Sequence, residues 1–328
     1  MATGKSALTT AEERAKLVEI VRVTRERSGW ATSRVLEKLD IPETTYYRWL
    51  RWSDVPRRPT RWSNVYEVLP EEREAIIRYA REHPNPRHRE LAWKMVDEGV
   101  VAVSPSTVYR ILVEENLIPQ WDRPDEQAET KPRFKPTRPD EQWATDITYI
   151  KIGGRNYYLL TFIDEYSRYI THHVLITSMD QYTVGWAAQD AFSKLGDLKP
   201  TIVTDNGSPF VSREFKRVLS YNGVGHHRID PHTPQQNAIC ERSMRTIKDA
   251  LPEELKDLEE ARRVIDEIID HYNNVRYHSS LGYLRPVDYY RGDPVALHEE
   301  RRARILAARH HRKEINLERR QATFYAEA

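Results

Sequence analysis

Apolar residues recur at helical spacing through the first fifty positions of the chain. In residues 10–29, Leu17, Val18 and Val21 are separated by the three- and four-residue steps of one helix face, with charged residues between them. Two shorter runs, 31–41 and 42–52, follow, and a proline at the start of the last run suits the first turn of a helix. The pattern predicts three helices with a short turn before the third, the order of a helix-turn-helix DNA-binding unit. A three-helix bundle that binds protein would have the same pattern.

A similar arrangement returns in residues 69–118. Two amphipathic runs, 69–84 and 87–100, precede a third, 105–118, which begins with Ser104 as a cap and Pro105 in the first turn. Two such units in tandem favour DNA binding more than either unit alone. The predicted contacts lie on or near the last helix of each unit: Thr44, Thr45, Tyr47, Arg48 and Arg51 in the first, and Ser106, Thr107 and Arg110 in the second.

Segments rich in proline and charge separate these units from each other and from the rest of the chain. We expect a helix-turn-helix domain at 1–55, a linker at 56–68, a second helix-turn-helix domain at 69–118 and a basic, proline-rich linker at 119–138. Basic linker residues could follow a phosphate backbone, or they could belong to solvated connectors. These residues are Arg57, Arg58 and Arg61 in the first linker, and Lys131, Arg133, Lys135 and Arg138 in the second.

From residue 139 the pattern changes to short β-type runs and then to alternating helix and strand. Strands are predicted at 142–152, 155–170 and 171–178, with a hairpin turn at Gly153–Gly154, and then at 199–207 and 224–229. Helices are predicted at 180–195, 212–223, 239–251 and 254–274. The fold class is therefore α/β, a mixed sheet with helices on its faces, over 139–292. The Arg-rich tail, 293–328, has a helical pattern with little apolar face, so we expect it to dock on a partner or on DNA, or to be disordered.

Composition restricts the class of protein. Of the 328 residues, 39% are hydrophobic and 31% are charged, which is typical of a globular chain. A single cysteine, Cys240, cannot build a disulfide framework or a multi-cysteine zinc site within one chain. The first residues lack the apolar core of a secretory signal, and no apolar run reaches the length of a membrane span, so we expect a cytoplasmic protein without a membrane partner. A net charge of +1 gives no overall signature of nucleic-acid binding.

Three acidic residues carry the candidate chemistry. Asp146 lies within the first predicted strand, and Asp205 ends a later strand in TDNG. Thirty-five residues separate Asp205 from Glu241, which lies in a helical run. Mg²⁺ takes carboxylate oxygens as ligands, and two such ions held together can activate an attacking oxygen and stabilise a leaving one. A strand that ends in a carboxylate places it where α/β sheets bind ligands. The three acids therefore indicate a two-metal site for phosphoryl transfer.

The residues around these acids resemble a known family. WATDITYI, FIDEYSRYI, TDNGSPF, TPQQNAICERSMRTIK and YNNVRYHSSLGYLRPVDYY occur in order. Together they resemble the integrase-type core of bacterial insertion-sequence transposases, which is similar to that of retroviral integrases. The resemblance covers about residues 138–292. It implies an RNase H-like fold and a D-D-(35)-E site at Asp146, Asp205 and Glu241 that holds two Mg²⁺ or Mn²⁺ ions.

The resemblance also implies a reaction and partners. The chain would release a 3′-OH at each transposon end by hydrolysis and then join that 3′-OH to target DNA, without a covalent protein–DNA intermediate. It would act as a homo-oligomer, a dimer or tetramer, in a synaptic complex with terminal inverted repeats and target DNA. The chain departs from retroviral integrases because one cysteine cannot form their His/His/Cys/Cys zinc domain. Ile239 and Cys240 also stand before the glutamate where small residues are more usual.

Further polar residues near the acids are candidate DNA contacts: Asn206, Gln235, Gln236, Asn237, Arg242, Arg245 and Lys248. Loop capping and pairing on the helix surface are the alternative roles for these residues. Two other functions fit the same sequence. One is a metal-dependent RNase H-like nuclease that cuts without joining, and the other is a DNA-binding regulator with a silent core.

Overall fold

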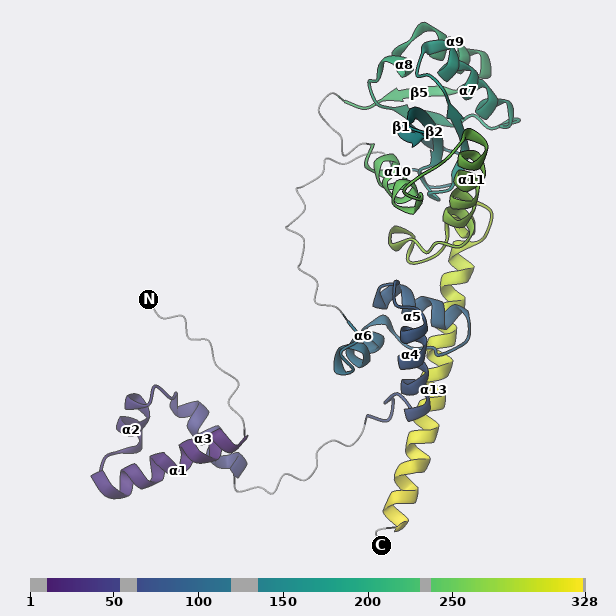
Figure 1. Ribbon diagram of the computed structural model, residues 1–328. Helices are drawn as coiled ribbons and strands as arrows, with labels where there is room; N and C mark the ends of the chain where they lie inside the picture. Colours follow the sequence, from purple (N-terminus) through teal and green to yellow (C-terminus); the bar gives the residue numbers. More distant parts are fainter. Residues whose placement is uncertain (1–10, 54–63, 119–134, 231–236, 327–328) are drawn as a thin grey trace. The chain divides into compact units, whose positions relative to one another are not determined.

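The computed structural model describes residues 11–53, 64–118, 135–230 and 237–326 (Figure 1). The chain divides into two compact units, Met1–Glu67 with Lys313–Ala328, and Val68–Arg312. Each unit is considered by itself below.

The first unit contains three helices, α1 (Ala11–Ser28), α2 (Thr32–Lys38) and α3 (Glu43–Ser53), together with the end of the long C-terminal helix α13 (Pro294–Ala326). Val21, Val35, Leu36 and Tyr46 form its small core. Gly29 has a φ of +67°, a conformation that glycine adopts without cost, and its N–H bonds to the carbonyl of Arg25 at 2.9 Å. The three helices correspond to the apolar runs seen in the sequence.

The second unit begins with another group of three helices, α4 (Pro70–Glu82), α5 (His88–Asp97) and α6 (Pro105–Glu114). We call these the second helical group. Ile76, Met95, Val108 and Leu112 are fully or almost fully buried between them. The hydroxyl of Ser104 accepts a hydrogen bond from the Thr107 backbone and caps α6, as the sequence predicts.

A five-stranded sheet forms the centre of the rest of the second unit. Its strands are β1 (Gln142–Ile152), β2 (Arg155–Asp164), β3 (Ile170–Ile176), β4 (Thr201–Thr204) and β5 (Gly225–Arg228), in the order β3-β2-β1-β4-β5. The first three strands are antiparallel, while β4 runs parallel to β1, and β5 runs parallel to β4. Gly153 and Gly154 both have positive φ and make the tight β1–β2 turn. This mixed sheet confirms the predicted α/β class.

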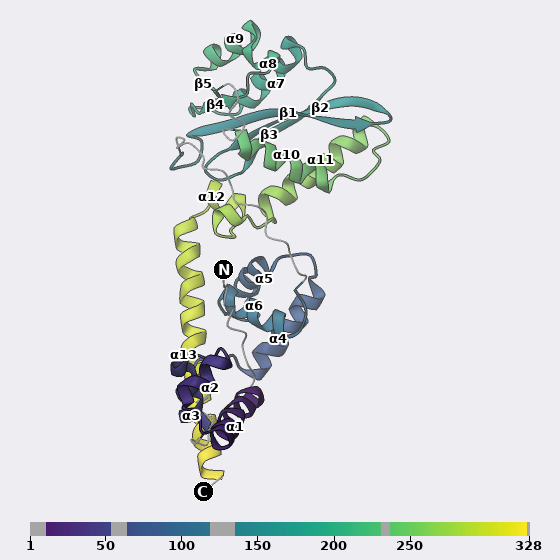
Figure 2. The ribbon, with the colours of Figure 1, turned by 90° about the vertical axis from the view of Figure 1, so that its left-hand side faces the viewer.

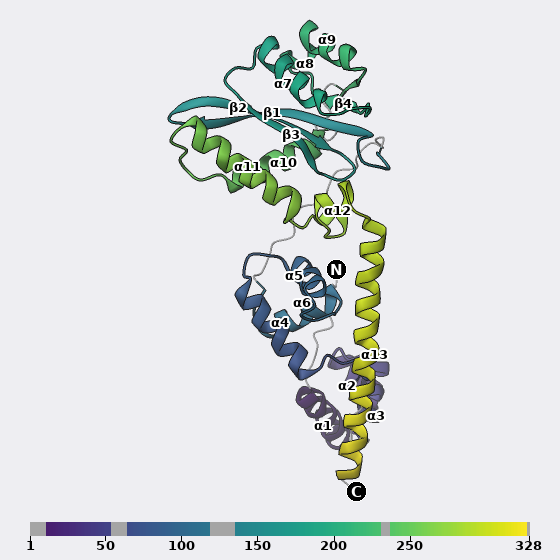
Figure 3. The ribbon, with the colours of Figure 1, turned by 90° about the vertical axis from the view of Figure 1, so that its right-hand side faces the viewer.

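Helices cover both faces of the sheet (Figures 2 and 3). One face carries α7 (Gln181–Ser193), α8 (Ser208–Val211) and α9 (Arg213–Asn222), and the other carries α10 (Ala238–Ala250) and α11 (Leu258–Asn274). Phe162 packs on the α7 side and its neighbour Ile163 on the α10 side, because successive strand residues point to opposite faces. The short helix α8 was not predicted.

The second strand is shorter than predicted. It ends at Asp164 instead of continuing to residue 170, because the Asp164 carboxylate accepts hydrogen bonds from the backbone N–H and hydroxyl of Ser167 and from the N–H of Asp140. These bonds hold a turn in which Arg168 has a φ of +64°. At the edge of the sheet, the buried amide of Asn273 accepts from the N–H of Ile170 at 2.8 Å and donates to its carbonyl at 3.0 Å.

The chain after α11 is ordered into a 3₁₀ turn (Ser279–Leu281), α12 (Pro286–Tyr290) and α13. The α13 segment is helical, so disorder of the described tail is excluded. The α13 helix packs without an apolar face because arginines take the buried positions. Among its described side chains, Arg301 and Arg312 are buried, at 3% and 5% exposure. Within the described ranges, no helix is both long enough and apolar enough to cross a membrane.

Candidate active site

Asp146 lies on β1, and Asp205 directly follows the end of the adjacent parallel strand β4. Ala144 of β1 pairs with Val203 of β4, and each aspartate lies two residues beyond its member of that pair. Both Ala144 and Val203 pack on the α10 side of the sheet. Because side chains alternate along a strand and neighbouring strands are about 4.8 Å apart, the two carboxylates belong to the same face and the same end of the ladder.

Glu241 comes from the helix that covers this face. Cys240, Met244 and Ile247 fix α10 against the sheet, and the hydroxyl of Thr161 on β2 contacts the Met244 sulfur at 3.8 Å. Glu241 follows the fully buried Cys240 and is itself exposed. The buried side of α10 therefore sets the position from which Glu241 extends.

The electrostatics of Asp146 show that these acids act on one another. The pKa of Asp146 is raised to about 6, chiefly by burial and also by the negative charges of Asp205 and Glu241, while the Ile147 N–H bond and the Lys248 ammonium oppose the rise. The N–H of Ile147 lies 2.8 Å from Oδ1 of Asp146. An ionised Asp146 is thus costly unless a cation compensates it.

The turn after β4 holds Asp205. The N–H of Gly207 donates to Oδ1 of Asp205 at 2.8 Å, and the side-chain amide of Asn206 donates to the carbonyl of Ile229 at 2.9 Å. The Asn206 bond ties the turn to the segment that follows β5. Asn206, proposed from the sequence as a DNA contact, therefore has a structural role here, although it is exposed.

The donor set suits a hard divalent cation. All three side chains offer carboxylate oxygens, the ligands that Mg²⁺ and Mn²⁺ prefer, and burial together with the neighbouring acids raises the pKa of Asp146. Among the residues described, no three His, Cys, Asp or Glu side chains converge on one point as ligands of a single ion.

Two family profiles, both described as an integrase core domain, match residues 136–234 and 222–286. Residues 136–286 are thus similar to integrase core domains, and we refer to them below as the integrase core domain.

Bacterial transposases are among the relatives of this chain. It is 28% identical over 159 residues to the putative transposase InsK of insertion sequence element IS150 from Escherichia coli, covering 48% of this chain and 56% of the relative. It is 31% identical over 160 residues to the transposase of insertion sequence element IS904 from Lactococcus lactis, covering 48% and 63%. The chain thus spans less than two thirds of the length of either relative.

Solved structures of viral integrases also match. The catalytic core domain of HTLV-2 integrase in complex with magnesium is 21% identical, with a TM-score of 0.38, over 47% of this chain and 98% of that chain. A chain of the simian T-cell lymphotropic virus intasome in complex with PP2A regulatory subunit B56 gamma is 16% identical, with a TM-score of 0.44, over 66% and 74%.

The candidate DNA contacts around the integrase core site fall into three groups. Arg242, Arg245 and Lys248 are exposed on α10, and Lys248 is near enough to Asp146 to lower its pKa. Asn237 is instead 4% exposed at the start of α10, so this conformation does not present it to DNA, contrary to our expectation. The predicted contacts Gln235 and Gln236 lie outside the described residues.

The structure describes most of the candidate contacts on α3 and α6. Tyr47 is 50% exposed on α3 and Thr44 is exposed, while Thr45 is half-buried. On α6, Ser106 and Arg110 are exposed and Thr107 is half-buried. Nε of Arg110 donates to the Ser106 carbonyl at 3.4 Å. The side chains of Arg48 and Arg51 lie outside the described set.

Sequence reasoning missed an apolar part of the α6 surface. Tyr109 and Val113 are 45% and 46% exposed on this helix, and the Tyr109 ring lies 4.9 Å from that of His88, at the start of α5. The sequence VYRILVE has more apolar residues than one buried face of a helix can accommodate. This excess was the feature from which an exposed apolar surface could have been predicted. In the linkers, Lys135 and Arg138 are exposed, whereas Arg57, Arg58, Arg61, Lys131 and Arg133 are not among the residues described.

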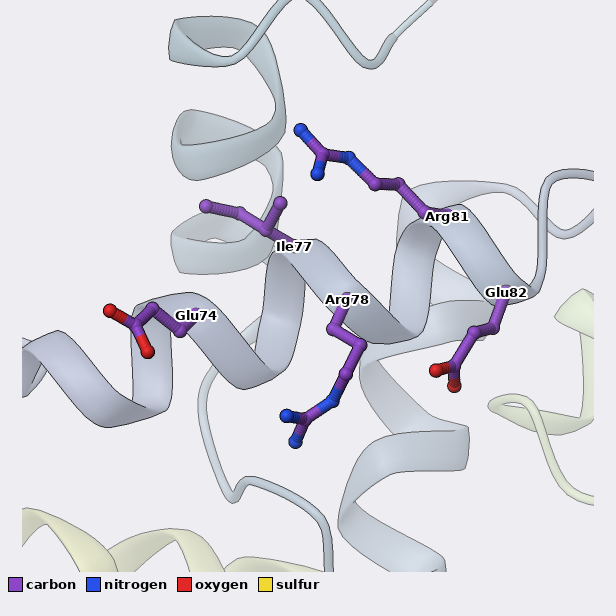
Figure 4. Close-up of a pocket in the computed structure, with 5 residues that line it drawn as sticks. All are labelled: Glu74, Ile77, Arg78, Arg81 and Glu82. Atoms are coloured by element: carbon purple, nitrogen blue, oxygen red, sulfur yellow. The ribbon is translucent and has the colours of Figure 1, made fainter.

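A surface hollow of about 470 Å³ lies on α4, away from the three acids (Figure 4). Five side chains line it, all from this one helix: Glu74, Ile77, Arg78, Arg81 and Glu82. Without a wall from a second element it cannot enclose a ligand, and we assign none to it.

Proposed function

We propose that the chain is a DNA transposase that binds transposon ends, nicks them to give 3′-OH groups and joins these to target DNA. The integrase core domain and the transposase relatives support a role in DNA transposition or integration. The observation that carries the proposal is the register of Asp146 and Asp205 on the face covered by the helix of Glu241. The charges of Asp205 and Glu241, which both raise the pKa of Asp146, support a site that these three carboxylates share.

Asp146, Asp205 and Glu241 would hold two Mg²⁺ or Mn²⁺ ions, with Asp146 shared between them. When bound, such ions polarise the scissile phosphate and favour formation of the attacking oxygen nucleophile. The partly buried position of Asp146 gives its carboxylate a strong preference for a cation over water. Arg245 and Lys248 lie one and two turns after Glu241 on the same helix face, where they would bind the DNA phosphates beside the acids.

The helical units would choose the DNA that reaches this site. In this proposal α3 and α6 enter major grooves of the terminal repeats, and exposed cations such as Arg138 contact the backbone. Two ends must be cut and joined together, so the working form would be a homo-oligomer in a synaptic complex. The reaction requires access to chromosomal DNA, and we therefore place the protein in the bacterial cytoplasm.

A strand-transfer assay tests this function. The full chain is incubated with Mg²⁺, a labelled transposon-end duplex and a supercoiled plasmid, and joined products are separated by size. Joining of the 3′-OH end to the plasmid is expected. Cutting without joining would instead indicate a nuclease, and end binding without either reaction would indicate a silent regulator.

Asp205→Asn supplies the matched test of the site. The variant should lose cleavage and joining by at least 1,000-fold, because one ion loses a charged ligand, while end binding stays unchanged. Asp197→Asn, at an exposed acid of the same domain, is the control and should retain activity. Cleavage at the normal rate by Asp205→Asn would refute the site.

A further inference from the structure

A buried arginine joins segments that are far apart in the sequence. Arg301 of α13 donates from Nε to Oδ1 of Asp97 at 2.7 Å and from a terminal nitrogen to Oδ2 of the same carboxylate. Its guanidinium also donates to the carbonyls of Gly282 and Tyr283, at 3.2 and 2.8 Å. Asp97 ends α5 in the second helical group, whereas Gly282 and Tyr283 follow α11 of the integrase core domain. One side chain therefore connects both to α13.

Aromatic rings complete the surroundings of this pair. The Arg301 guanidinium lies 5.0 Å from the centre of the Trp93 ring and 5.8 Å from that of Tyr277. The Tyr277 hydroxyl donates to Oδ2 of Asp97 at 2.9 Å. Tyr277 comes from the segment after α11, so the carboxylate of Asp97 is shared by that segment and by α13. A buried ion pair tolerates desolvation only with such a full set of partners.

Two more arginines of α13 bind the same helical group. Arg304 donates to the carbonyls of Val96 and Asp97 at 2.8 and 3.0 Å, at the carboxyl end of α5, where the helix dipole is negative. Arg312, also buried, donates to Glu72 at 2.7 Å and to the carbonyl of Ala102 at 2.6 Å. The three arginines thus reach α4, the end of α5 and the connection to α6.

We propose that Arg301, Arg304 and Arg312 clamp the second helical group to the integrase core domain, and so hold α6 at a fixed distance from the three acids. We call these residues the arginine clamp. They are positioning residues, since their donors are engaged within the protein and not with DNA. The consequence for DNA rests on the proposed function: the nicked phosphate should lie at a constant number of base pairs from the sequence that α6 contacts.

A distance measurement tests the clamp without any assumption about function. Spin labels are attached at Glu74→Cys on α4 and at Tyr221→Cys on α9, both exposed positions, in a chain whose native Cys240 is buried. Pulsed electron–electron double resonance should give one narrow distribution of the distance between the two labels. Arg301→Leu should at least double its width. Arg302→Leu, at the adjacent exposed arginine of the same helix, is the matched control and should leave it unchanged.

Asp97→Asn provides a second variant if Arg301→Leu does not fold, because asparagine keeps the side-chain shape and one carbonyl acceptor. It should also broaden the distribution, while its melting transition stays cooperative. A broad distribution in the parent chain, or an unchanged width in the folded clamp variants, would overturn the clamp.

The consequence for DNA has its own readout. The 3′ ends produced by the full chain with Mg²⁺ are mapped at nucleotide resolution on a transposon-end duplex. The parent chain and Arg302→Leu should cut at one position, and clamp variants should spread the cuts over neighbouring phosphates with end affinity retained. One unchanged cut position in a variant with a broadened distribution would refute the positioning role. Absence of cutting in every chain would refute the proposed function, while the distance measurement would still decide the clamp.

Discussion

A methyl group built on Gly207 would lie 2.9 Å from Oδ1 of Asp205, the oxygen to which the Gly207 N–H now donates. A real Cβ does not approach an oxygen so closely, so either the turn or the carboxylate has to shift. Glycine at 207 is thus required by the place of Asp205, and not by its own backbone angles, since its φ is −58°.

We therefore expect Gly207→Ala to lower DNA cleavage by about 100-fold, the effect of moving a reacting group by roughly an ångström. End binding, measured by mobility shift, should be unchanged. Ser208→Ala, at the exposed neighbouring position, is the control and should retain cleavage. Equal rates for both variants would show that the position of Asp205 does not limit the reaction.

The raised pKa of Asp146 predicts a link between pH, metal and stability. The pKa rises from 3.8 to about 6 in the folded chain, so its protonated form adds stability that is complete below pH 3.8 and lost as pH rises through 6. The loss is on the order of 2–3 kcal/mol. Relative to Asp146→Asn, the metal-free parent chain should lose thermal stability over this interval.

Added Mg²⁺ should restore the melting temperature of the parent chain at pH 7.5 and leave that of Asp146→Asn unchanged. Asp197→Asn serves again as the control and should respond like the parent. An equal Mg²⁺ response in Asp146→Asn would mean that the ion binds elsewhere.

His278 predicts a pH effect of the opposite sign. Burial lowers the pKa of its imidazole from 6.5 to about 4, assisted by the charges of Arg276 and Arg168. The unfolded chain then binds the additional proton, so this contribution to stability is complete above pH 6.5 and is lost as pH falls toward 4. In urea unfolding, the free energy of unfolding of the parent chain should fall by about 1 kcal/mol for each unit by which the pH is lowered, relative to His278→Gln. The same substitution at the exposed His271 should leave the slope unaltered.

Arg110 of α6 predicts a specific change in DNA affinity. Its guanidinium is exposed and lies 3.3 Å from the Thr107 hydroxyl, near the start of the helix. If it binds one phosphate, Arg110→Ala should weaken end binding and reduce the slope of log affinity against log salt by about one. Arg78→Ala, at an exposed arginine of α4, is the matched control. Identical salt slopes for the two variants would remove α6 from the DNA interface.

The sequence was sufficient for the sheet, for Asp146 within a strand and for Asp205 at the end of another. Alternation places Asp146 with Ala144 and Ile150, and the polar run TDNG ends a buried strand, so both features follow from local pattern. The end of β2 did not follow, because a run of apolar and aromatic residues continues past Asp164. Only the hydrogen bonds of that carboxylate to Ser167 and Asp140 show where the strand stops.

The C-terminal helix shows a different limit of prediction. Hydrophobic patterning counts arginine as a surface residue, and nothing near Arg301 in the sequence supplies the acceptors that allow its burial. Those acceptors are Asp97, Gly282 and Tyr283, which come together only in the folded chain. The burial of Asn237 at the start of α10 likewise has no counterpart in the local sequence pattern.

The amide of Asn273 has a consequence for how copies of this chain can meet. An outer strand with free N–H and C=O groups invites a strand from another molecule, the usual route to uncontrolled sheet growth. Asn273 occupies both groups of Ile170, at the first residue of β3, and so imitates the neighbour that this strand lacks. If several copies gather around DNA, as the proposed function requires, this point of β3 is protected from joining them by sheet extension, and their assembly would depend on side-chain surfaces.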